Sequence, residues 1–237
     1  EIRNADGVYS IIMDYGDVDA LFIGKIETWD EIKNDLSDEM PIIRFPKYDG
    51  CSDVTKGYEW HEFINNHDPI QNPHTPKLSD LWTIIFTSGT TGNPKGVMLT
   101  YQAIDGIKVV LDDPNNPLGI KHTGNNDFIS YLPLNHIFER VVIEWCSFRY
   151  GGTISFVESI EKFGQNLKSV QPHVFAAAPR VWTKLQMGIL SKFPQKRLDF
   201  LLKIPVFSSI LKKLIRKGLG FSKVRVTVSG SAPMPVE

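Results

Sequence analysis

This sequence has few cysteines, no long apolar run and no large excess of charge of one sign. The 237 residues contain two cysteines, Cys51 and Cys146, without metal-ligand spacing or disulfide density, which favours a reducing compartment. No run of about 18 apolar residues occurs, so no helix is predicted to span a bilayer. A formal net charge of −1 provides no global basic field, so nucleic acid is not an expected partner.

The chain also lacks an initial methionine and a secretory signal. It begins at Glu1, and neither a basic stretch nor an apolar stretch of the secretory type follows. We therefore expect a piece of a longer intracellular protein, either cytoplasmic or peripheral on an internal membrane. The composition, 42% hydrophobic and 22% charged, is that of an ordinary folded protein with room for one large domain or two small ones.

What the sequence does contain is an alternation of short apolar runs with amphipathic stretches of helical length. The β-rich runs, bounded by Gly, Pro, Asn or Asp, predict buried strands. They lie at residues 20–24, 41–45, 81–86, 128–132, 153–156, 173–177 and 224–228. Helices are predicted at residues 101–111, 137–149, 159–170 and 180–191. This order predicts an α/β fold with mostly parallel sheets and flanking helices.

A proline-rich stretch divides the chain into parts. Residues 65–80 (NNHDPIQNPHTPKLSD) hold three prolines and few apolar side chains, which predicts a connector. We expect residues 1–64 to form an early α/β part of the domain. Residues 81–237 are expected to form the core subdomain that carries the chemistry.

The segment after the third predicted strand suits a polyphosphate. It reads TSGTTGNPKG and begins at Thr87. Its glycines permit sharp turns through which backbone N–H groups can converge on a ligand, and its hydroxyls add short donors. Lys95 adds a positive charge that can reach a phosphate. Because Asn93 and Pro94 separate Gly92 from Lys95, the segment is not a Walker A loop, which disfavours a P-loop kinase or GTPase.

Three segments together resemble a known superfamily. TSGTTGNPKGVMLTY resembles the phosphate-binding signature of the acyl-adenylate-forming enzymes, which include acyl-CoA synthetases, luciferases and peptide-synthetase adenylation domains. LPLNHIFER, from Leu132, is similar to the form found in long-chain fatty acyl-CoA synthetases. SGSAP, from Ser229, resembles the turn that the superfamily places against adenine. The resemblance covers nearly the whole chain and identifies it as the central part of the large N-terminal domain.

The resemblance implies ATP-dependent activation of a long-chain fatty acid. The fatty carboxylate would attack the α-phosphorus of ATP in the presence of Mg²⁺, and the thiol of coenzyme A would then displace AMP from the acyl-AMP. Donors around the phosphates would stabilise the charge that develops there. The implied ATP-binding residues are Thr87, Ser88, Gly89, Thr90, Thr91, Gly92, Lys95, Gly230, Ser231, Ala232 and Pro233.

Two residues have further implied roles. Thr87 would also ligate Mg²⁺, and His136 would act near the acyl carboxylate or the α-phosphate. The other five histidines lie in no such motif, and we expect them to be structural or at the surface.

Other parts that the resemblance implies are missing from these 237 residues. The family's Thr-Glu stretch, its ribose-binding aspartate and its lid lysine would all follow Pro233, so we expect this piece alone to form no acyl-CoA. Two alternatives stay open. One is another adenylate-forming enzyme, such as an amino-acid adenylation domain, and the other is a non-catalytic nucleotide-binding module.

A last pattern lies at residues 206–217 (VFSSILKKLIRK). Six apolar residues from Val206 onward recur at helical spacing, and Lys212, Lys213, Arg216 and Lys217 are expected on the opposite side. Such a basic amphipathic helix can make peripheral contact with an anionic membrane. The alternative, which the sequence favours, is a surface helix that packs its apolar stripe on the protein core.

Overall fold

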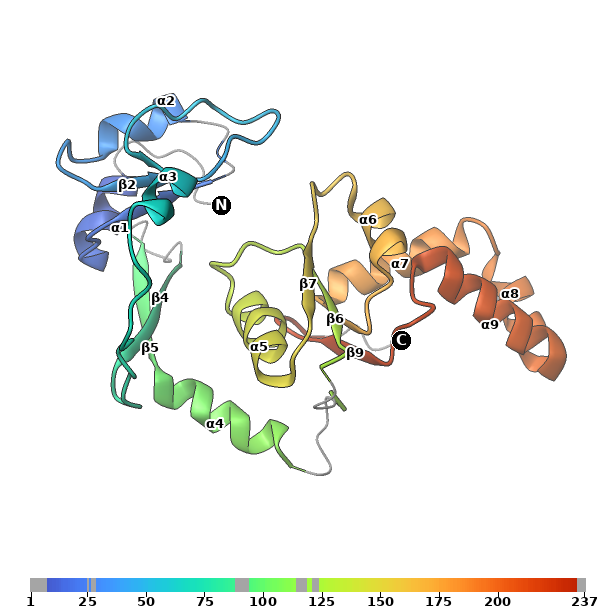
Figure 1. Cartoon of the computed structure of the whole chain (residues 1–237). Helices are drawn as coiled ribbons and strands as arrows, with labels where there is room; N and C mark the ends of the chain where they lie inside the picture. The colour runs from blue at the N-terminus through green and yellow to red at the C-terminus, as the bar shows by residue number, and fades with distance from the viewer. Residues whose placement is uncertain are drawn as a thin grey trace. The chain divides into compact units, whose positions relative to one another are not determined.

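The chain folds into two compact units, one up to Ala103 and one from Ile104. The computed structural model describes residues 8–24, 26, 29–87, 94–113, 119–120 and 124–233. Figure 1 shows the elements coloured along the chain. The division falls inside helix α4 (Tyr101–Leu111), whose span agrees with the predicted helix 101–111. The three-part division at residues 65–80 stays a prediction.

The first unit contains a three-stranded parallel sheet in the order β1-β2-β3. The strands are β1 (Leu21–Ile23), β2 (Ile42–Arg44) and β3 (Tyr58–Glu59). The helical segments are α1 (Val8–Gly16), α2 (Trp29–Ile32), a 3-10 turn (Lys33–Asp35) and α3 (Trp60–Asn65). Apolar side chains from β1, α2 and β2 form its core, including Ile23, Ile32 and Ile42. The predicted strands 20–24 and 41–45 are thus confirmed.

A two-stranded antiparallel sheet belongs to the same unit. Strand β4 (Leu81–Thr87) pairs with β5 (Lys95–Thr100), with Ile84 opposite Met98. The sequence predicted β4 but not β5, because the short run around Met98 shows no alternation and follows directly on a glycine-rich loop. This pair is the exception to the otherwise parallel sheets of the described chain.

The second unit is built on a four-stranded, fully parallel sheet in the order β7-β6-β8-β9. The strands are β6 (Asp127–Ser130), β7 (Thr153–Phe156), β8 (Val174–Ala177) and β9 (Val226–Ser229). All four were predicted within a few residues. Helical segments connect them, as parallel pairing requires.

Helices cover both faces of this sheet. Successive side chains of a strand point to opposite faces, so Phe128 and Ile129 of β6 enter different core clusters. Phe128 packs with the π-helix η2 (Glu139–Trp145) and α5 (Cys146–Tyr150). Ile129 packs with α6 (Phe163–Val170) and α7 (Pro179–Leu190). The resulting α/β architecture confirms the predicted fold class (Figure 1).

Two predicted helices differ in detail. The helix expected over 137–149 runs mostly as the π-helix η2 before it continues as α5. The helix expected over 159–170 begins only at Phe163. The reason is local, because the hydroxyl of Ser159 accepts the N–H of Lys162 at 3.3 Å and forms a turn in place of the first helical turn.

The basic pattern at residues 206–217 lies within one helix, α9 (Pro205–Leu219), and a second helix, α8 (Gln195–Lys203), precedes it. Helix α8 ends before Ile204, and α9 starts at a proline, which has no N–H to continue the preceding helix. Every helix in the described ranges is too short or too polar to cross a bilayer.

The faces of α9 differ from the prediction of one apolar side and one basic side. Ser208 and Leu211 face inward, whereas four large apolar side chains are 54 to 68% exposed. These are Val206, Phe207, Ile210 and Leu214. Lys213 and Lys217 follow Ile210 and Leu214 by three residues, so they lie beside these apolar side chains and not opposite them.

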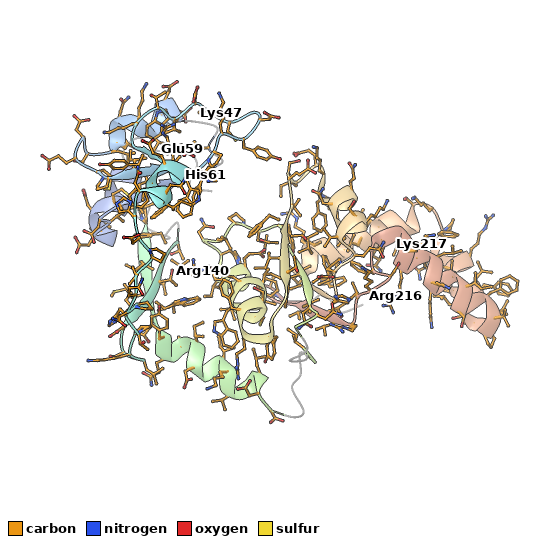
Figure 2. All side chains as sticks on the ribbon, viewed as in Figure 1. Lys47, Glu59, His61, Arg140, Arg216 and Lys217 are labelled. Carbon is orange, nitrogen blue, oxygen red and sulfur yellow. The ribbon has the colours of Figure 1, made fainter. Side chains whose placement is uncertain are left out.

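Arg216 is exposed, as the prediction of a solvated basic face requires, but its guanidinium is also anchored to the backbone. Its Nη2 donates to the carbonyl of Val224 at 2.6 Å, and its Nε donates to the carbonyl of Phe221 at 3.2 Å (Arg216 is labelled in Figure 2). The arginine therefore ties the end of α9 to the chain that leads into β9.

Candidate functional site

The two ends of the predicted phosphate loop are held together by a hairpin. Thr87, the last residue of β4, lies directly opposite Lys95, the first residue of β5. The Thr87 hydroxyl donates to the carbonyl of Lys95 at 3.5 Å, and both residues are exposed. The pairing brings one hydroxyl and one cationic side chain to the same end of the hairpin. The remaining loop residues of the prediction lie outside the described residues, namely Ser88, Gly89, Thr90, Thr91 and Gly92.

His136 lies in the segment that connects β6 to the π-helix. Its backbone N–H donates to the carbonyl of Pro133 at 2.9 Å, and its carbonyl accepts the N–H of Glu139 at 3.0 Å. The imidazole is half-buried, and its Nδ1 accepts the backbone N–H of Phe138 at 3.2 Å. A backbone N–H therefore holds the ring at Nδ1, and Nε2 is the ring nitrogen that remains to contact a ligand.

Glu139 is a buried acid in the same segment. It is 1% exposed, and its Oε1 accepts the backbone N–H of Tyr131 at 3.1 Å. Burial raises the pKa of Glu139, while hydrogen bonds from the Ser130 side chain and from the backbone of Tyr131 and Leu132 oppose that rise. Burial also raises the pKa of the Tyr131 phenol to about 12. Both ends of the segment that carries His136 are thus tied to one carboxyl.

The next acid along this helix has a different environment. Glu144 lies with its Oε2 3.1 Å from the Nε of Arg140, and both side chains are about one quarter exposed (Arg140 is labelled in Figure 2). The contact is an ion pair whose atoms do not have regular hydrogen-bond geometry. Glu144 therefore balances a neighbouring charge, whereas Glu139 holds backbone donors.

The predicted adenine turn follows β9. Gly230 packs against the ring of Phe138, and a Cβ added at this glycine would lie 2.9 Å from the ring's Cε2. Ser231 adopts a φ of 69°, in the left-handed region that side chains other than glycine rarely occupy. Ala232 and Pro233 are exposed. The turn is thus shaped for close approach of the motif that contains His136.

The second unit brings two predicted parts of the site to one edge. His136 follows the end of β6, and Gly230 follows the end of β9, in a sheet whose strands are all parallel. The carboxyl edge of such a sheet is where α/β folds usually bind ligands. Thr87 and Lys95 belong to the first unit, so the predicted site residues are carried by two units.

Glu139 is the residue that the sequence interpretation missed. Its position in HIFER, three residues after His136, was a weak signal, because an acid in a helix normally faces solvent. The predicted structural role of His173 has an explanation in the fold. The Nδ1 of His173 accepts the N–H of Asp127 at 3.1 Å and links β8 to β6 at the opposite edge.

Comparison with known proteins gives a consistent result at three levels. A profile described as AMP-binding enzyme matches residues 10–237. Long chain acyl-CoA synthetase 4 of Arabidopsis thaliana is 31% identical over 204 residues, which is 75% of this chain and 30% of the relative. Long-chain-fatty-acid–CoA ligase 5 of Rattus norvegicus is 34% identical over 198 residues, which is 73% of this chain and 29% of the relative. The chain thus spans about 30% of the length of these relatives.

Solved structures agree at the level of the fold. The crystal structure of the anthranilate CoA ligase AuaEII in complex with anthranoyl-AMP superposes with a TM-score of 0.65 at 16% identity. The match covers 99% of this chain and 40% of that protein.

Proposed function

The chain belongs to the AMP-binding enzyme family, and from that premise we propose that the whole protein is an ATP-dependent long-chain fatty acid–CoA ligase. The observation that carries the proposal is the set of relatives: one named as a long chain acyl-CoA synthetase and one named as a long-chain-fatty-acid–CoA ligase exceed 30% identity over about three quarters of this chain. The motif LPLNHIFER, which resembles the form in those enzymes, supports the same substrate class.

The proposed reaction has two steps. A carboxylate oxygen of the fatty acid attacks the α-phosphorus of ATP, and the bond to the β-phosphate oxygen breaks, which gives acyl-AMP and pyrophosphate. The thiolate of coenzyme A then attacks the acyl carbonyl carbon, and AMP leaves with the former carboxylate oxygen. Both steps concentrate negative charge on oxygen atoms, so fixed donors in the site lower their barriers.

The residues of this chain fit parts of that task. Lys95 supplies a cation, and Thr87 a hydroxyl, at the mouth of the loop proposed to hold the β- and γ-phosphates. Gly230 to Pro233 are proposed to border the adenine, since the turn lies at the carboxyl edge of a parallel sheet. His136, at the same edge, is proposed to face the acyl carboxylate or the α-phosphate.

Mg²⁺ would be held in part by Thr87. Magnesium in nucleotide sites binds one or two protein oxygens together with substrate phosphates and water, and the exposed hydroxyl of Thr87 is an oxygen of that kind. When bound, the ion neutralises charge on the phosphate oxygens. Within the described ranges, no group of three His, Cys, Asp or Glu side chains is arranged to hold a metal without substrate.

The test is ATP–pyrophosphate exchange by the full-length protein. We expect exchange that depends on a long-chain fatty acid such as palmitate, with thioester formation once coenzyme A is added. Exchange driven by an amino acid, with palmitate inert, would assign the protein to the amino-acid adenylation domains. ATP binding without exchange on any carboxylate would leave a non-catalytic nucleotide-binding module.

We also propose that α8 and α9 contact an anionic membrane. The α8–α9 surface consists of the exposed apolar side chains Phe200, Val206, Phe207, Ile210 and Leu214 together with the basic residues of both helices. From Gln195 to Leu219 the chain carries seven basic residues and one acidic residue, although the whole chain has a net charge of −1. Apolar and cationic side chains side by side suit the interface between lipid headgroups and acyl chains.

A further inference from the structure

The segment from Tyr131 to Glu139 is closed on itself by backbone hydrogen bonds. The His136 N–H donates to the carbonyl of Pro133, and the N–H groups of Glu139 and Arg140 both donate to the carbonyl of His136, at 3.0 and 3.2 Å. The backbone of His136 is therefore fixed from both directions. Its side chain can then be aimed by a small number of further contacts.

One of those contacts determines which imidazole nitrogen carries the proton. Nδ1 of His136 accepts the backbone N–H of Phe138, so Nδ1 must present a lone pair. A neutral imidazole with an accepting Nδ1 carries its hydrogen on Nε2. Phe138 is held in turn, because its ring packs against Gly230 and against the core of the second unit. The structure therefore presents Nε2–H as a hydrogen-bond donor. A donor suits the stabilisation of an anionic oxygen, whereas removal of a proton from a substrate would need a free lone pair on Nε2.

The carboxyl of Glu139 holds the start of this segment. It accepts the N–H of Tyr131 at 3.1 Å, and Ser130 and Leu132 supply further donors. At 1% exposure the side chain has almost no contact with solvent, so a role through its neighbours is favoured over direct contact with a substrate. Burying a carboxyl costs free energy unless hydrogen-bond donors surround it. A buried acid at this position therefore suggests that its hydrogen bonds serve the site as well as the fold.

We propose that Glu139 is a positioning residue that fixes His136 as an Nε2–H donor toward the reacting oxygen atoms. The proposal rests on the proposed adenylation function. The buried carboxyl of Glu139, at the start of the π-helix, accepts a hydrogen bond from Tyr131, at the end of β6. This link holds the segment between them, which includes His136, in one conformation. Without that link the Phe138 N–H and the His136 ring lose their alignment.

The first experiment reads the tautomer and does not depend on turnover. The full-length protein labelled with ¹⁵N-histidine is studied by long-range ¹H–¹⁵N correlation, and His136→Ala assigns the His136 signals. We expect the Nε2–H tautomer in the wild type. The Nδ1–H tautomer in the wild type would overturn the proposal, even if the fatty acid–CoA ligase assignment holds.

The second experiment is a double-mutant cycle on palmitate-dependent ATP–pyrophosphate exchange. Removing one donor to a developing oxyanion typically costs about 100-fold or more, so His136→Ala should lower kcat by roughly that factor. Glu139→Gln should lower kcat by about 10-fold, since a disordered donor loses part of that effect. In the double variant the Glu139→Gln effect should vanish, because the residue acts through His136.

Two further variants keep the test decisive. Glu144→Gln changes an acid of the same helix that pairs with the side chain of Arg140 and not with the Arg140 N–H that donates to His136. It should leave both kcat and the tautomer unchanged. Ser130→Ala keeps the carboxyl and removes one of its donors, so it should give a smaller loss if Glu139→Gln does not fold. A Glu139→Gln or Ser130→Ala loss of equal size with and without His136 would assign Glu139 a purely structural role.

Discussion

The ring of Phe138 occupies the space that a side chain at Gly230 would need, with only 2.9 Å between Cε2 and a Cβ added at the glycine. Two motifs that lie about 90 residues apart in sequence, LPLNHIFER and SGSAP, therefore meet at this contact. A side chain at Gly230 would press on Phe138, the residue whose backbone N–H donates to the ring of His136.

Gly230→Ala should weaken ATP use. The added methyl must displace the Phe138 ring, and overpacking of this kind costs typically about 1–3 kcal/mol. Steady-state kinetics of the full-length protein should show a raised KM for ATP, and thermal unfolding should show a modest fall in Tm. Phe138→Leu in the same chain makes room for the methyl and should restore part of the ATP affinity. ATP kinetics unchanged by Gly230→Ala would argue against placing this turn at the adenine.

Lys95→Ala should lower kcat/KM for ATP. A hydrogen bond to a charged group contributes about 1.5–3 kcal/mol, which corresponds to roughly 10- to 150-fold. Lys108→Ala is the matched control, since Lys108 is an exposed lysine on α4 that lies 3.9 Å from Asp105. Equal ATP kinetics in the two variants would remove Lys95 from the phosphate site. Gly92→Ala offers an independent test of the same loop.

The two cysteines should differ in reactivity. Cys146 is fully buried, and burial raises the pKa of its thiol to about 12, so almost no thiolate is present near neutral pH. Cys51 is partly exposed. Iodoacetamide applied to the native full-length protein, followed by peptide mass spectrometry, should label Cys51 well before Cys146, and denaturant should abolish the difference. Rapid native labelling of Cys146 would show that the second unit opens readily.

Stability should depend on pH through Glu139. Because burial raises its pKa in the folded state, the folded protein binds this proton more tightly than the unfolded chain does. The carboxyl therefore favours folding most below its unfolded pKa of about 4.3, and that contribution is lost as pH rises through the higher folded pKa. Urea unfolding across this pH range should show the wild type losing stability relative to Glu139→Gln. A difference that stays constant with pH would contradict the expectation.

Binding to anionic vesicles should depend on lysines of the α8–α9 surface. Replacing Lys212, Lys213 and Lys217 with Gln should lower co-sedimentation, and added salt should lower wild-type binding, because the attraction is screened. Arg216 is left in place because it ties the end of α9 to Phe221 and Val224. The matched control replaces three lysines elsewhere, Lys33, Lys47 and Lys168. Equal loss in both triple variants would indicate a general charge effect, and self-association in place of vesicle binding would indicate a protein partner.

The apolar runs of the sequence were enough to predict every strand of the described parallel sheets except β3 (Tyr58–Glu59), which is two residues long and contains no apolar run. Buried parallel strands carry apolar residues on both faces, so VFAA of β8 is a clear signal, and all four residues are buried. Strand β5 was missed because its residues are mostly exposed and their pattern depends on pairing with β4. The break between α8 and α9 could have been predicted from Pro205, which cannot continue a helix.

The candidate site shows the same limits. His136 and Gly230 could be proposed as site residues from motifs, because each motif combines unusual residue types in a fixed order. The burial of Glu139 could not be predicted, since it results from the packing of the π-helix on β6 and not from any local pattern. Likewise, the outward position of Val206 and Ile210 follows from which side of α9 meets the core, and the helical period alone does not determine that side.

The strand order of the second unit has a consequence for how the protein is made. Strand β6 pairs with β7, its neighbour in sequence, and with β8, whereas β9 pairs with β8 only after three intervening helices. Because a ribosome releases the chain from its N-terminus, the edge of β8 stays without a strand until Ser229 has emerged. Parallel pairs of this kind close slowly, since long loops must be ordered first. Newly made chains at this stage expose the edge of β8 and the aromatic side chains beside it, which favours aggregation. The yield of folded protein should therefore depend on translation speed and on the supply of chaperones.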